Sequence, residues 1–458
     1  MSDPVLDHLL GDHDGIINRL IDYAKIPSVS TDPAYADGMA AARALLADRL
    51  VAAGFNNVEE IAAGGHPAVC AEWLGLPGTP TYLVYGHYDV QPPDPLDKWH
   101  SPPFEPQIRD GRLYGRGVSD DKGPASIALE VLFAYLAVEG CLPVNIKVLL
   151  EGEEEVGSAT LPAILERHAD RLRADAVISA DGARWRADLP SVNTGSRGNM
   201  AFELAVRTAS KDLHSGRFGG AVPNAAHVLA DLVAGLHSPD GKVSVDGFYD
   251  GIDNPDGTTR ADISGLPFDE AAFFAAIGSV PFGEDGFSTL ERLWLRPTLE
   301  VNGMWSGYTG EGGKTVTPAE AFAKITTRLV PGQDPARVAR ALQRHFERAC
   351  PAGASIDFAP RDDGNAAYLV PPDLPLLLAV EDAIEDALGA KPVRVRVGST
   401  LPLSDMIRRA LGIDTVTLSF STADEDFHSP NEFFRLSAIE EGVTAWTSLL
   451  RRLGRVAE

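Results

Sequence analysis

Short apolar runs alternate with helical segments along this chain, and that alternation constrains the fold more than any other feature. Residues 81–85, 144–150 and 175–180 are apolar runs of strand length, and 123–140 is a longer apolar stretch bounded by glycines. Strands that alternate with helices form mostly parallel sheets whose faces are covered. Further helices are predicted at 5–24, 39–53, 374–388 and 436–453, and a further strand at 416–420. The sequence therefore predicts an α/β fold with a mostly parallel sheet.

The pattern changes after Asn193 and returns to the α/β alternation near Asp373. The segment between them predicts strands on one side of two helices, which is typical of an inserted α+β domain of the ferredoxin-like kind. Its strands are predicted at 199–207, 320–330 and 354–360, and its helices at 224–236 and 334–348. We therefore expect one domain formed by residues 1–193 and 365–458, interrupted by a second domain at 194–364.

The charge balance excludes some partners. Asp and Glu total 65 against 40 for Lys and Arg, a formal net charge of −25. A chain this acidic repels nucleic acid phosphates and anionic membranes, so we expect neither as a partner.

The three cysteines, Cys70, Cys141 and Cys350, are far apart and lack zinc-ribbon spacing, which suits a reducing compartment. No signal peptide or membrane span is evident, and we expect a cytoplasmic protein.

Histidines and acidic residues follow the predicted strands at their carboxyl ends. Ligands of open parallel sheets bind at this edge, so side chains from separate segments should meet there. They are His87 and Asp89 after the first strand, Glu153, Glu154 and Glu155 after the second, Asp181 after the third, His428 after the strand at 416–420, and Asp120 and Asp121 before the apolar helix. Each of these alone is commonly a loop or surface residue. Their shared edge is what predicts a site.

Several carboxylates in one crevice repel each other unless a cation lies among them. Two histidines with three or more carboxylates suit Zn²⁺, with Mn²⁺ or Co²⁺ as alternatives, and a pair of ions would share a bridging carboxylate. Asp89 is too close to His87 to be a separate ligand, so we expect it to accept a hydrogen bond from the imidazole. The sequence has no P-loop, no GxGxxG after a strand and no GxSxG elbow, which leaves metal-dependent chemistry as the prediction.

Seven motifs resemble, in this order, those of the dinuclear metallopeptidases related to carnosine dipeptidase and carboxypeptidase G. They are GHYDVQP, GRGVSDDKGP, EGEEEVGS, DLHSG, YTGEGGKTVTP, TTRLVP and HSPNE. The resemblance covers nearly the whole chain, and KDLHSG with the extended YTGEGGKTVTP is most similar to the cytosolic dipeptidase branch. It implies a catalytic domain, an inserted lid and dimerisation domain, and a homodimer.

The resemblance also implies two metal ions, most readily Zn²⁺, held by five side chains. His87 and Asp181 would hold one ion, Glu155 and His428 would hold the other, and Asp120 would bridge both.

The resemblance implies further roles in the reaction. Glu154 would be the general base that deprotonates the metal-bound water and then passes the proton to the leaving amine. Asp89 would orient His87. The peptide bond between Asp120 and Asp121 would be cis.

Residues of the inserted domain are implied in catalysis and in substrate binding. The counterpart of His214 reaches into the partner subunit's site and stabilises the oxyanion. The counterpart of Arg328 binds the substrate carboxylate, for which a guanidinium offers two parallel hydrogen bonds, and that of Thr315 lies close by. The stretch RVGSTLP departs from the Arg-Glu-Gly-Gly-Ser-Ile-Pro common in dipeptidase relatives. Val397 stands where these relatives often have Glu, and the missing carboxylate would weaken recognition of a free amino terminus. Thr400 stands where they have Ser, and we expect Thr400 to bind substrate.

These features predict a dinuclear metal-dependent hydrolase that cleaves the amide bond of dipeptides with a free C-terminal carboxylate. Two alternatives stay open. One is an amidase or deacylase that cleaves N-acyl amino acids at the same site. The other is a catalytically inactive relative that acts as a binding protein, which the retained ligand positions and Glu154 argue against.

Overall fold

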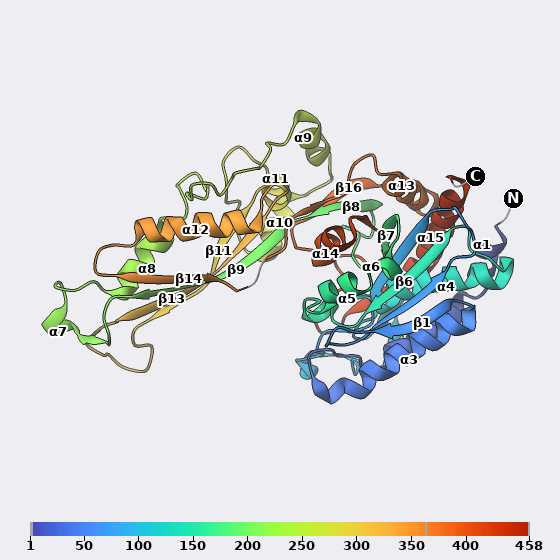
Figure 1. Ribbon diagram of the computed structural model, residues 1–458, viewed down its shortest axis with the longest axis horizontal. Helices are drawn as coiled ribbons and strands as arrows, with labels where there is room; N and C mark the ends of the chain where they lie inside the picture. The colour runs from blue at the N-terminus through green and yellow to red at the C-terminus, as the bar shows by residue number, and fades with distance from the viewer. Residues whose placement is uncertain (1–2, 362–363, 457–458) are drawn as a thin grey trace. The chain divides into compact units, whose positions relative to one another are not determined.

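The computed structural model describes residues 3–361 and 364–456, and the chain forms two compact units (Figure 1). Unit 1 consists of Met1–Thr194, Val370–Val395 and Met406–Glu458, and unit 2 of Gly195–Leu369 and Arg396–Asp405. Unit 1 is therefore discontinuous in the sequence. Among the described residues, no helix combines the length and the apolar character needed to cross a membrane.

Unit 1 is built on a six-stranded sheet in the order β1-β2-β6-β3-β7-β17. Strands β6, β3, β7 and β17 are parallel, whereas β2 pairs antiparallel with β6, and β1 antiparallel with β2. The strands are β1 (Asn56–Ile61), β2 (Ala68–Trp73), β3 (Thr81–His87), β6 (Asn145–Glu151), β7 (Ala176–Ser179) and β17 (Asp414–Thr417). The structure thus confirms an α/β fold with a largely parallel central sheet.

The last strand differs from its prediction at 416–420. β17 pairs with β7 only over Asp414–Thr417, and one further backbone bond joins the Leu418 N–H to the Ser179 carbonyl (2.8 Å). Leu418 and Phe420 are nevertheless buried. Their apolar character reflects burial, which periodicity alone does not distinguish from strand pairing.

Helices cover the sheet of unit 1. The predicted apolar helix is α4 (Lys122–Glu139), which is buried along most of its length and contacts β3, α1, α2 and α15. It ends at Gly140, whose φ of 71° favours glycine. The single helix predicted at 5–24 is instead two helices, because the backbone of Asp12 is not helical. The helices are α1 (Pro4–Gly11), α2 (His13–Ala24), α3 (Ala36–Ala53), α5 (Leu161–Arg167), α6 (Ala169–Leu172), α13 (Pro375–Leu388) and α15 (Ser437–Val456).

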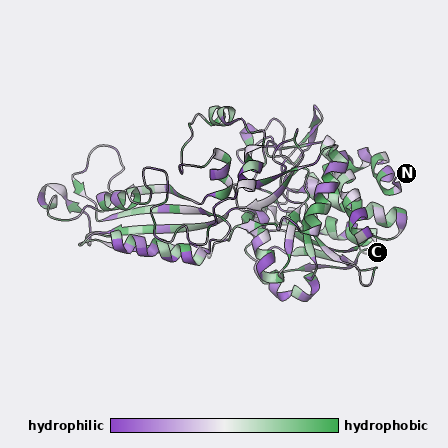
Figure 2. Cartoon of the chain, turned by 90° about the horizontal axis from the view of Figure 1, so that it is seen from above, coloured by the Kyte–Doolittle hydropathy of each residue, from purple (hydrophilic) through white to green (hydrophobic). Residues whose placement is uncertain are grey.

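Unit 2 contains a four-stranded antiparallel sheet in the order β11-β13-β9-β14. In chain order its elements are β9, α8, β11, β13, α12 and β14, the βαββαβ order of ferredoxin-like domains. Apolar side chains of the strands and of both helices form one core, and hydrophobic and hydrophilic residues are interspersed along the strands (Figure 2). The bounds are β9 (Gly198–Arg207), α8 (Ala225–Ala234), β11 (Thr298–Ser306), β13 (Glu320–Leu329), α12 (Pro335–Ala349) and β14 (Ser355–Pro360).

Shorter elements complete the two units. Between α8 and β11 the chain forms the short helices α9 (Gly257–Ser264), α10 (Glu270–Ile277) and α11 (Thr289–Leu295). The others are β4 (Gln107–Arg109), β5 (Arg112–Tyr114), β18 (Phe433–Arg435), β8 (Ser191–Ser196), β15 (Tyr368–Leu369), β16 (Val393–Val397), β10 (Leu213–His214), β12 (Val316–Thr317), α7 (Ser215–Phe218) and α14 (Pro402–Leu411).

Candidate metal centre

The carboxyl ends of the parallel strands in unit 1 lie level with one another because of their register. His87, the last residue of β3, pairs with Glu151, the last of β6, and Tyr85 pairs with Ser179, the last of β7. Thr417, which ends β17, pairs with Ser179 in turn. The residues that follow these strands therefore leave the sheet at one edge, where ligands of parallel sheets bind.

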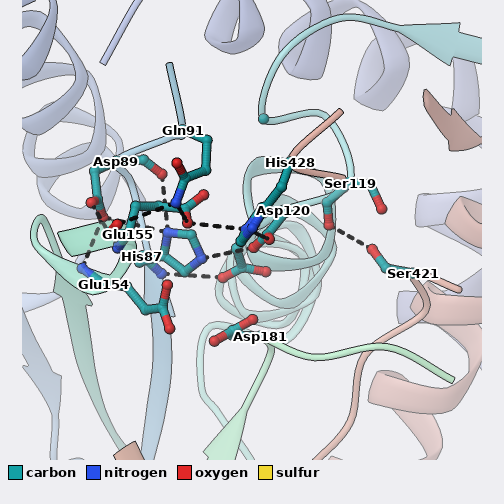
Figure 3. A network of polar contacts seen from close by, with 12 residues as sticks. His87, Asp89, Gln91, Ser119, Asp120, Glu154, Glu155, Asp181, Ser421 and His428 are labelled. Atoms are coloured by element: carbon teal, nitrogen blue, oxygen red, sulfur yellow. Dashed lines mark hydrogen bonds and ion pairs between the residues drawn. The ribbon is translucent and has the colours of Figure 1, made fainter. Parts of the chain in front are cut away.

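His87, Asp120 and Asp181 form a first group of potential metal ligands at this edge (Figure 3). The Nε2 atom of His87 lies 3.0 Å from Oδ1 of Asp120. One ligand atom from each of the three side chains lies within 4.8 Å of the others. These are the residues that the resemblance assigns to one ion.

Asp120 also belongs to a second group, with Glu155 and His428. The Nε2 atom of His428 lies 3.1 Å from Oδ2 of Asp120 and 3.1 Å from Oε2 of Glu155. The two oxygens of Asp120 thus face different histidines (Figure 3). The backbone of His428 has a φ of 63°, in the left-handed region that residues other than glycine adopt less often. A carboxylate placed in this way is suited to bridging two ions.

The adjacent carboxylates of Asp120 and Asp121 face different partners. The peptide bond between them is cis, as the resemblance implies. Whereas Asp120 faces the histidines, Oδ2 of Asp121 accepts a hydrogen bond from the backbone N–H of His87 (3.1 Å). Asp121, to which the sequence assigned no separate role, therefore fixes the end of β3.

Asp89 contacts His87 mainly through its backbone. The Nδ1–H of His87 donates to the Asp89 carbonyl oxygen (3.0 Å), whereas a carboxylate oxygen of Asp89 lies 3.5 Å away. The carboxylate instead accepts bonds from the backbone N–H groups of Glu154 (3.3 Å) and Glu155 (3.1 Å). Because a carbonyl oxygen can only accept, this arrangement leaves Nε2 of neutral His87 free to bind a metal.

The three consecutive glutamates after β6 have separate surroundings. Glu153 is buried and accepts hydrogen bonds from the backbone N–H groups of His66 (3.0 Å) and Thr160 (3.2 Å). Glu155 belongs to the second ligand group, and the Glu154 side chain points into the cluster near Asp181 (Figure 3). Glu154 is thus a candidate for proton transfer, and Glu153 is not.

Unit 2 holds the predicted catalytic His214 and the predicted substrate-binding residues at two separated places. His214 pairs with Val316, and the N–H of Ser215 donates to the Thr315 carbonyl (3.2 Å), so His214 and Thr315 are neighbours. They lie beside the start of β13 at Glu320.

Arg328 lies near the opposite end of β13 and donates through Nη1 to the Thr400 hydroxyl (2.8 Å). Eight residues of strand separate Glu320 from Arg328, which is about 26 Å. Within one chain Thr315 therefore lies by His214, whereas the expectation from the resemblance was a position close to Arg328. Val397, the last residue of β16, is half-buried.

The model of peptidase family M20/M25/M40 matches residues 83–452 of this chain. The chain belongs to this family. Among curated proteins, this M20 peptidase is 31% identical to the Beta-Ala-His dipeptidase of Homo sapiens over 80% of its own length and 73% of that protein. It is 27% identical to the Cys-Gly metallodipeptidase of Saccharomyces cerevisiae over 95% and 94% of the two chains. A solved M20 metallo-carboxypeptidase from Sulfolobus solfataricus has 30% identity and a TM-score of 0.82, with 96% and 99% of the chains covered.

The cluster of this metallopeptidase has a donor set and a charge that fit divalent cations. Burial, together with the neighbouring Asp120 and Glu155, raises the pKa of Asp181 to about 6. Burial also raises the pKa of Glu154 well above its usual range. Hydrogen bonds with Asp120 and Glu155 raise the pKa of His428 to about 10. Imidazole nitrogens and carboxylate oxygens are Zn²⁺ ligands, and cations among them would offset the buried negative charge.

Sequence reasoning missed residues that support the potential metal ligands of this M20 peptidase. Nε2 of Gln91 donates to Oε2 of Glu155 (2.8 Å), and the buried carboxylates of Glu425 and Glu432 bind the loop that carries Asp120. Gln91 and Glu432 stand inside the motifs GHYDVQP and HSPNE. Motif membership was the available signal, but their partners depend on contacts that only the fold creates.

Proposed function

We propose that this M20 peptidase is a dipeptidase that acts through a dinuclear metal centre on substrates with a free C-terminal carboxylate. The observation that carries the proposal is the pair of ligand groups that share Asp120. Two of the similar proteins are named as dipeptidases and a third as a carboxypeptidase. A carboxypeptidase also acts next to a free C-terminal carboxylate, so the three names agree on that part of the substrate.

The five ligand side chains would hold two ions in this proposal. His87 and Asp181 would bind one, Glu155 and His428 the other, and Asp120 both. Zn²⁺ suits the mixed nitrogen and oxygen donors, with Mn²⁺ or Co²⁺ as alternatives. When bound, the ions would supply Lewis-acid polarisation of the amide carbonyl and would lower the pKa of water.

Glu154 would move the proton. Its side chain points into the cluster near Asp181, where a carboxylate can accept a proton from water (Figure 3). It would accept a proton from the attacking water and deliver it to the nitrogen of the leaving amine. Asp89 would keep Glu154 in place, because its carboxylate accepts the Glu154 backbone N–H.

Arg328 would bind the substrate carboxylate. Its guanidinium has no acidic partner among the described residues and is held on one side by the Thr400 hydroxyl. The remaining N–H groups can bind a carboxylate through two parallel hydrogen bonds.

Val397 stands where dipeptidase relatives commonly have a glutamate, and this favours an N-acyl amino acid hydrolase as the second candidate function.

A homodimer would resolve the separation of the substrate-binding residues. His214 with Thr315 and Arg328 with Thr400 lie at opposite ends of β13, about 26 Å apart. A dipeptide spans only about 7 Å. One copy of unit 2 therefore cannot bring both pairs to the same dipeptide, and we propose that His214 and Thr315 serve the site of a partner subunit.

Cys70, Cys141 and Cys350 are free thiols, which supports a cytoplasmic enzyme.

The test is hydrolysis of matched substrates by enzyme loaded with Zn²⁺, Mn²⁺ or Co²⁺ after removal of metals. The panel pairs each dipeptide with its C-terminal amide and with its N-acetylated form. Cleavage of the free dipeptide and loss of cleavage on C-terminal amidation are expected. Faster cleavage of N-acylated substrates would favour the second candidate, and no cleavage with any metal would contradict a hydrolase.

A further inference from the structure

Glu432 is a fully buried carboxylate in the HSPNE motif, and its hydrogen bonds go to a loop rather than to the side chains of the proposed metal ligands. It accepts four hydrogen bonds from one loop of the chain. Oε2 accepts from Nη1 of Arg116 (2.8 Å) and the N–H of Gly117 (2.8 Å). Oε1 accepts from the N–H groups of Ser119 (2.9 Å) and Asp120 (3.2 Å).

These contacts require a carboxylate rather than a neutral side chain of the same shape. All four groups around Glu432 are donors, two for each oxygen. A glutamine would place an NH₂ group, which can only donate, against two of them. Two buried N–H groups would then lose their acceptor, and a buried donor without an acceptor destabilises the folded state.

The position of Glu432 connects two ligand segments that are distant in the sequence. It binds the backbone N–H of Asp120 directly, and it lies four residues after His428. His428 itself contacts the Asp120 carboxylate at 3.1 Å. The same short segment therefore supplies a ligand and holds the backbone of the proposed bridging ligand.

Other side chains of the same segment reinforce this connection. Oε2 of Glu425, also fully buried, accepts a hydrogen bond from the Ser119 hydroxyl (2.5 Å). The Ser421 hydroxyl donates to the Ser119 carbonyl (2.6 Å) (Figure 3). The residue immediately before Asp120 is thus fixed from its N–H, its carbonyl and its side chain.

We propose that Glu432 is a positioning residue that sets the Asp120 carboxylate between the two ligand groups, so that metal affinity depends on it although it is not a ligand. The inference rests on the proposed dinuclear centre. Outer residues that orient metal ligands commonly change metal affinity by about 10–100-fold when replaced. Glu432→Gln should lower affinity by an amount in this range, and it should affect both ions because Asp120 faces both groups.

The experiment measures metal binding, not turnover. Metal-free full-length protein is titrated with Zn²⁺ against a chromophoric chelator, and with Co²⁺ by its visible absorption. Wild type, Glu432→Gln and Glu432→Asp are compared. The aspartate keeps the charge but is one methylene shorter, so it provides a milder variant if the glutamine variant does not fold.

Glu130→Gln is the matched control. Glu130 is also a buried carboxylate with guanidinium partners, Arg19 and Arg49, but it lies in the middle of α4 and contacts none of the ligands. It should destabilise the metal-free protein without changing metal affinity. If Glu432 had a purely structural role, its variants would keep the metal affinity of the wild type, as this control does, when variants with the same loss of melting temperature are compared.

Two results overturn the inference in different ways. Zn²⁺ affinity within about threefold of wild type in every Glu432 variant that folds refutes the positioning role and leaves the proposed function intact, because the expected change is about 10–100-fold. A wild-type protein that binds no Zn²⁺ or Co²⁺ refutes the proposed centre and the inference together.

Discussion

His428 and Asp120 are 308 residues apart in the sequence, and their side chains lie 3.1 Å apart at the metal centre. The other oxygen of the same carboxylate lies 3.0 Å from His87. One aspartate therefore joins the first and the last of the ligand segments.

Replacement of Asp120 should damage metal binding more than replacement of either histidine. Asp120→Ala removes the only ligand common to both groups, whereas His87→Ala and His428→Ala each affect one. Metal content after dialysis, measured by plasma mass spectrometry, should be lowest for Asp120→Ala. Equal losses in all three variants would contradict a bridging role.

Glu154→Gln should separate proton transfer from metal binding. The amide keeps the shape of the side chain but cannot accept a proton, so metal content and substrate affinity should persist while kcat falls by about 10²–10⁴-fold. Glu153→Gln is the control, because Glu153 binds the backbone of His66 and Thr160. It should lower the melting temperature and leave kcat unchanged. If Glu153→Gln instead kept its metal and lost turnover, the base would have to be reassigned.

Mixed dimers test whether His214 acts across a subunit interface. Neither His214→Ala nor Glu154→Gln should be active alone. In a mixed dimer, the chain that carries His214→Ala keeps Glu154 and receives His214 from its partner, so one of the two sites is complete. An equal mixture should recover about a quarter of wild-type activity after random exchange. No recovery, with subunit exchange verified by mass spectrometry, would argue against sharing.

Arg328→Lys should raise KM for dipeptides while kcat changes less. A lysine keeps the charge but loses the forked pair of donors that matches a carboxylate. Dipeptides with an amidated C-terminus have no carboxylate to bind and should be poor substrates for wild type and variant alike. An unchanged KM would remove Arg328 from the substrate site.

Removal of metal should make stability depend on pH in a defined direction. The pKa of Asp181 rises from 3.8 to about 6 in the folded chain. A raised carboxyl pKa means that the native state holds the proton more tightly, so this stabilising contribution is full below about pH 4 and is lost as pH rises through about 6. The melting temperature of chelated protein should fall from pH 4 to 7, and Asp181→Asn should flatten that fall. If Asp181→Asn left the dependence of melting temperature on pH unchanged, the raised pKa of Asp181 would not be its cause.

Much of the candidate centre could be predicted because its potential ligands follow strands whose apolar runs are easily recognised. His87, Asp181 and Glu155 stand within four residues of a strand end, and parallel register places those ends together. His428 follows β17 at a greater distance, and it was grouped with the others because it follows the predicted strand at 416–420. Its pairing with Glu155 came from the resemblance.

What could not be predicted depends on contacts made by backbone groups. The His87 imidazole bonds to the Asp89 carbonyl rather than chiefly to its carboxylate, and no side-chain pattern reports this. The antiparallel pairing of β1 and β2 and the early end of β17 likewise follow from hydrogen bonding that hydropathy does not encode. The distance between Thr315 and Arg328 became visible only with the length of β13.

The interruption of unit 1 by unit 2 has a consequence for the order of events on the ribosome. Asp120 is synthesised 308 residues before His428, a delay on the order of 15–60 s at usual rates of chain elongation. Once residue 181 has been synthesised, the nascent chain carries His87, Asp120 and Asp181 but still lacks the segment that supplies His428 and Glu432. In the proposed centre, an ion captured early would meet only the first ligand group, and the second position would be filled only after His428 has been synthesised.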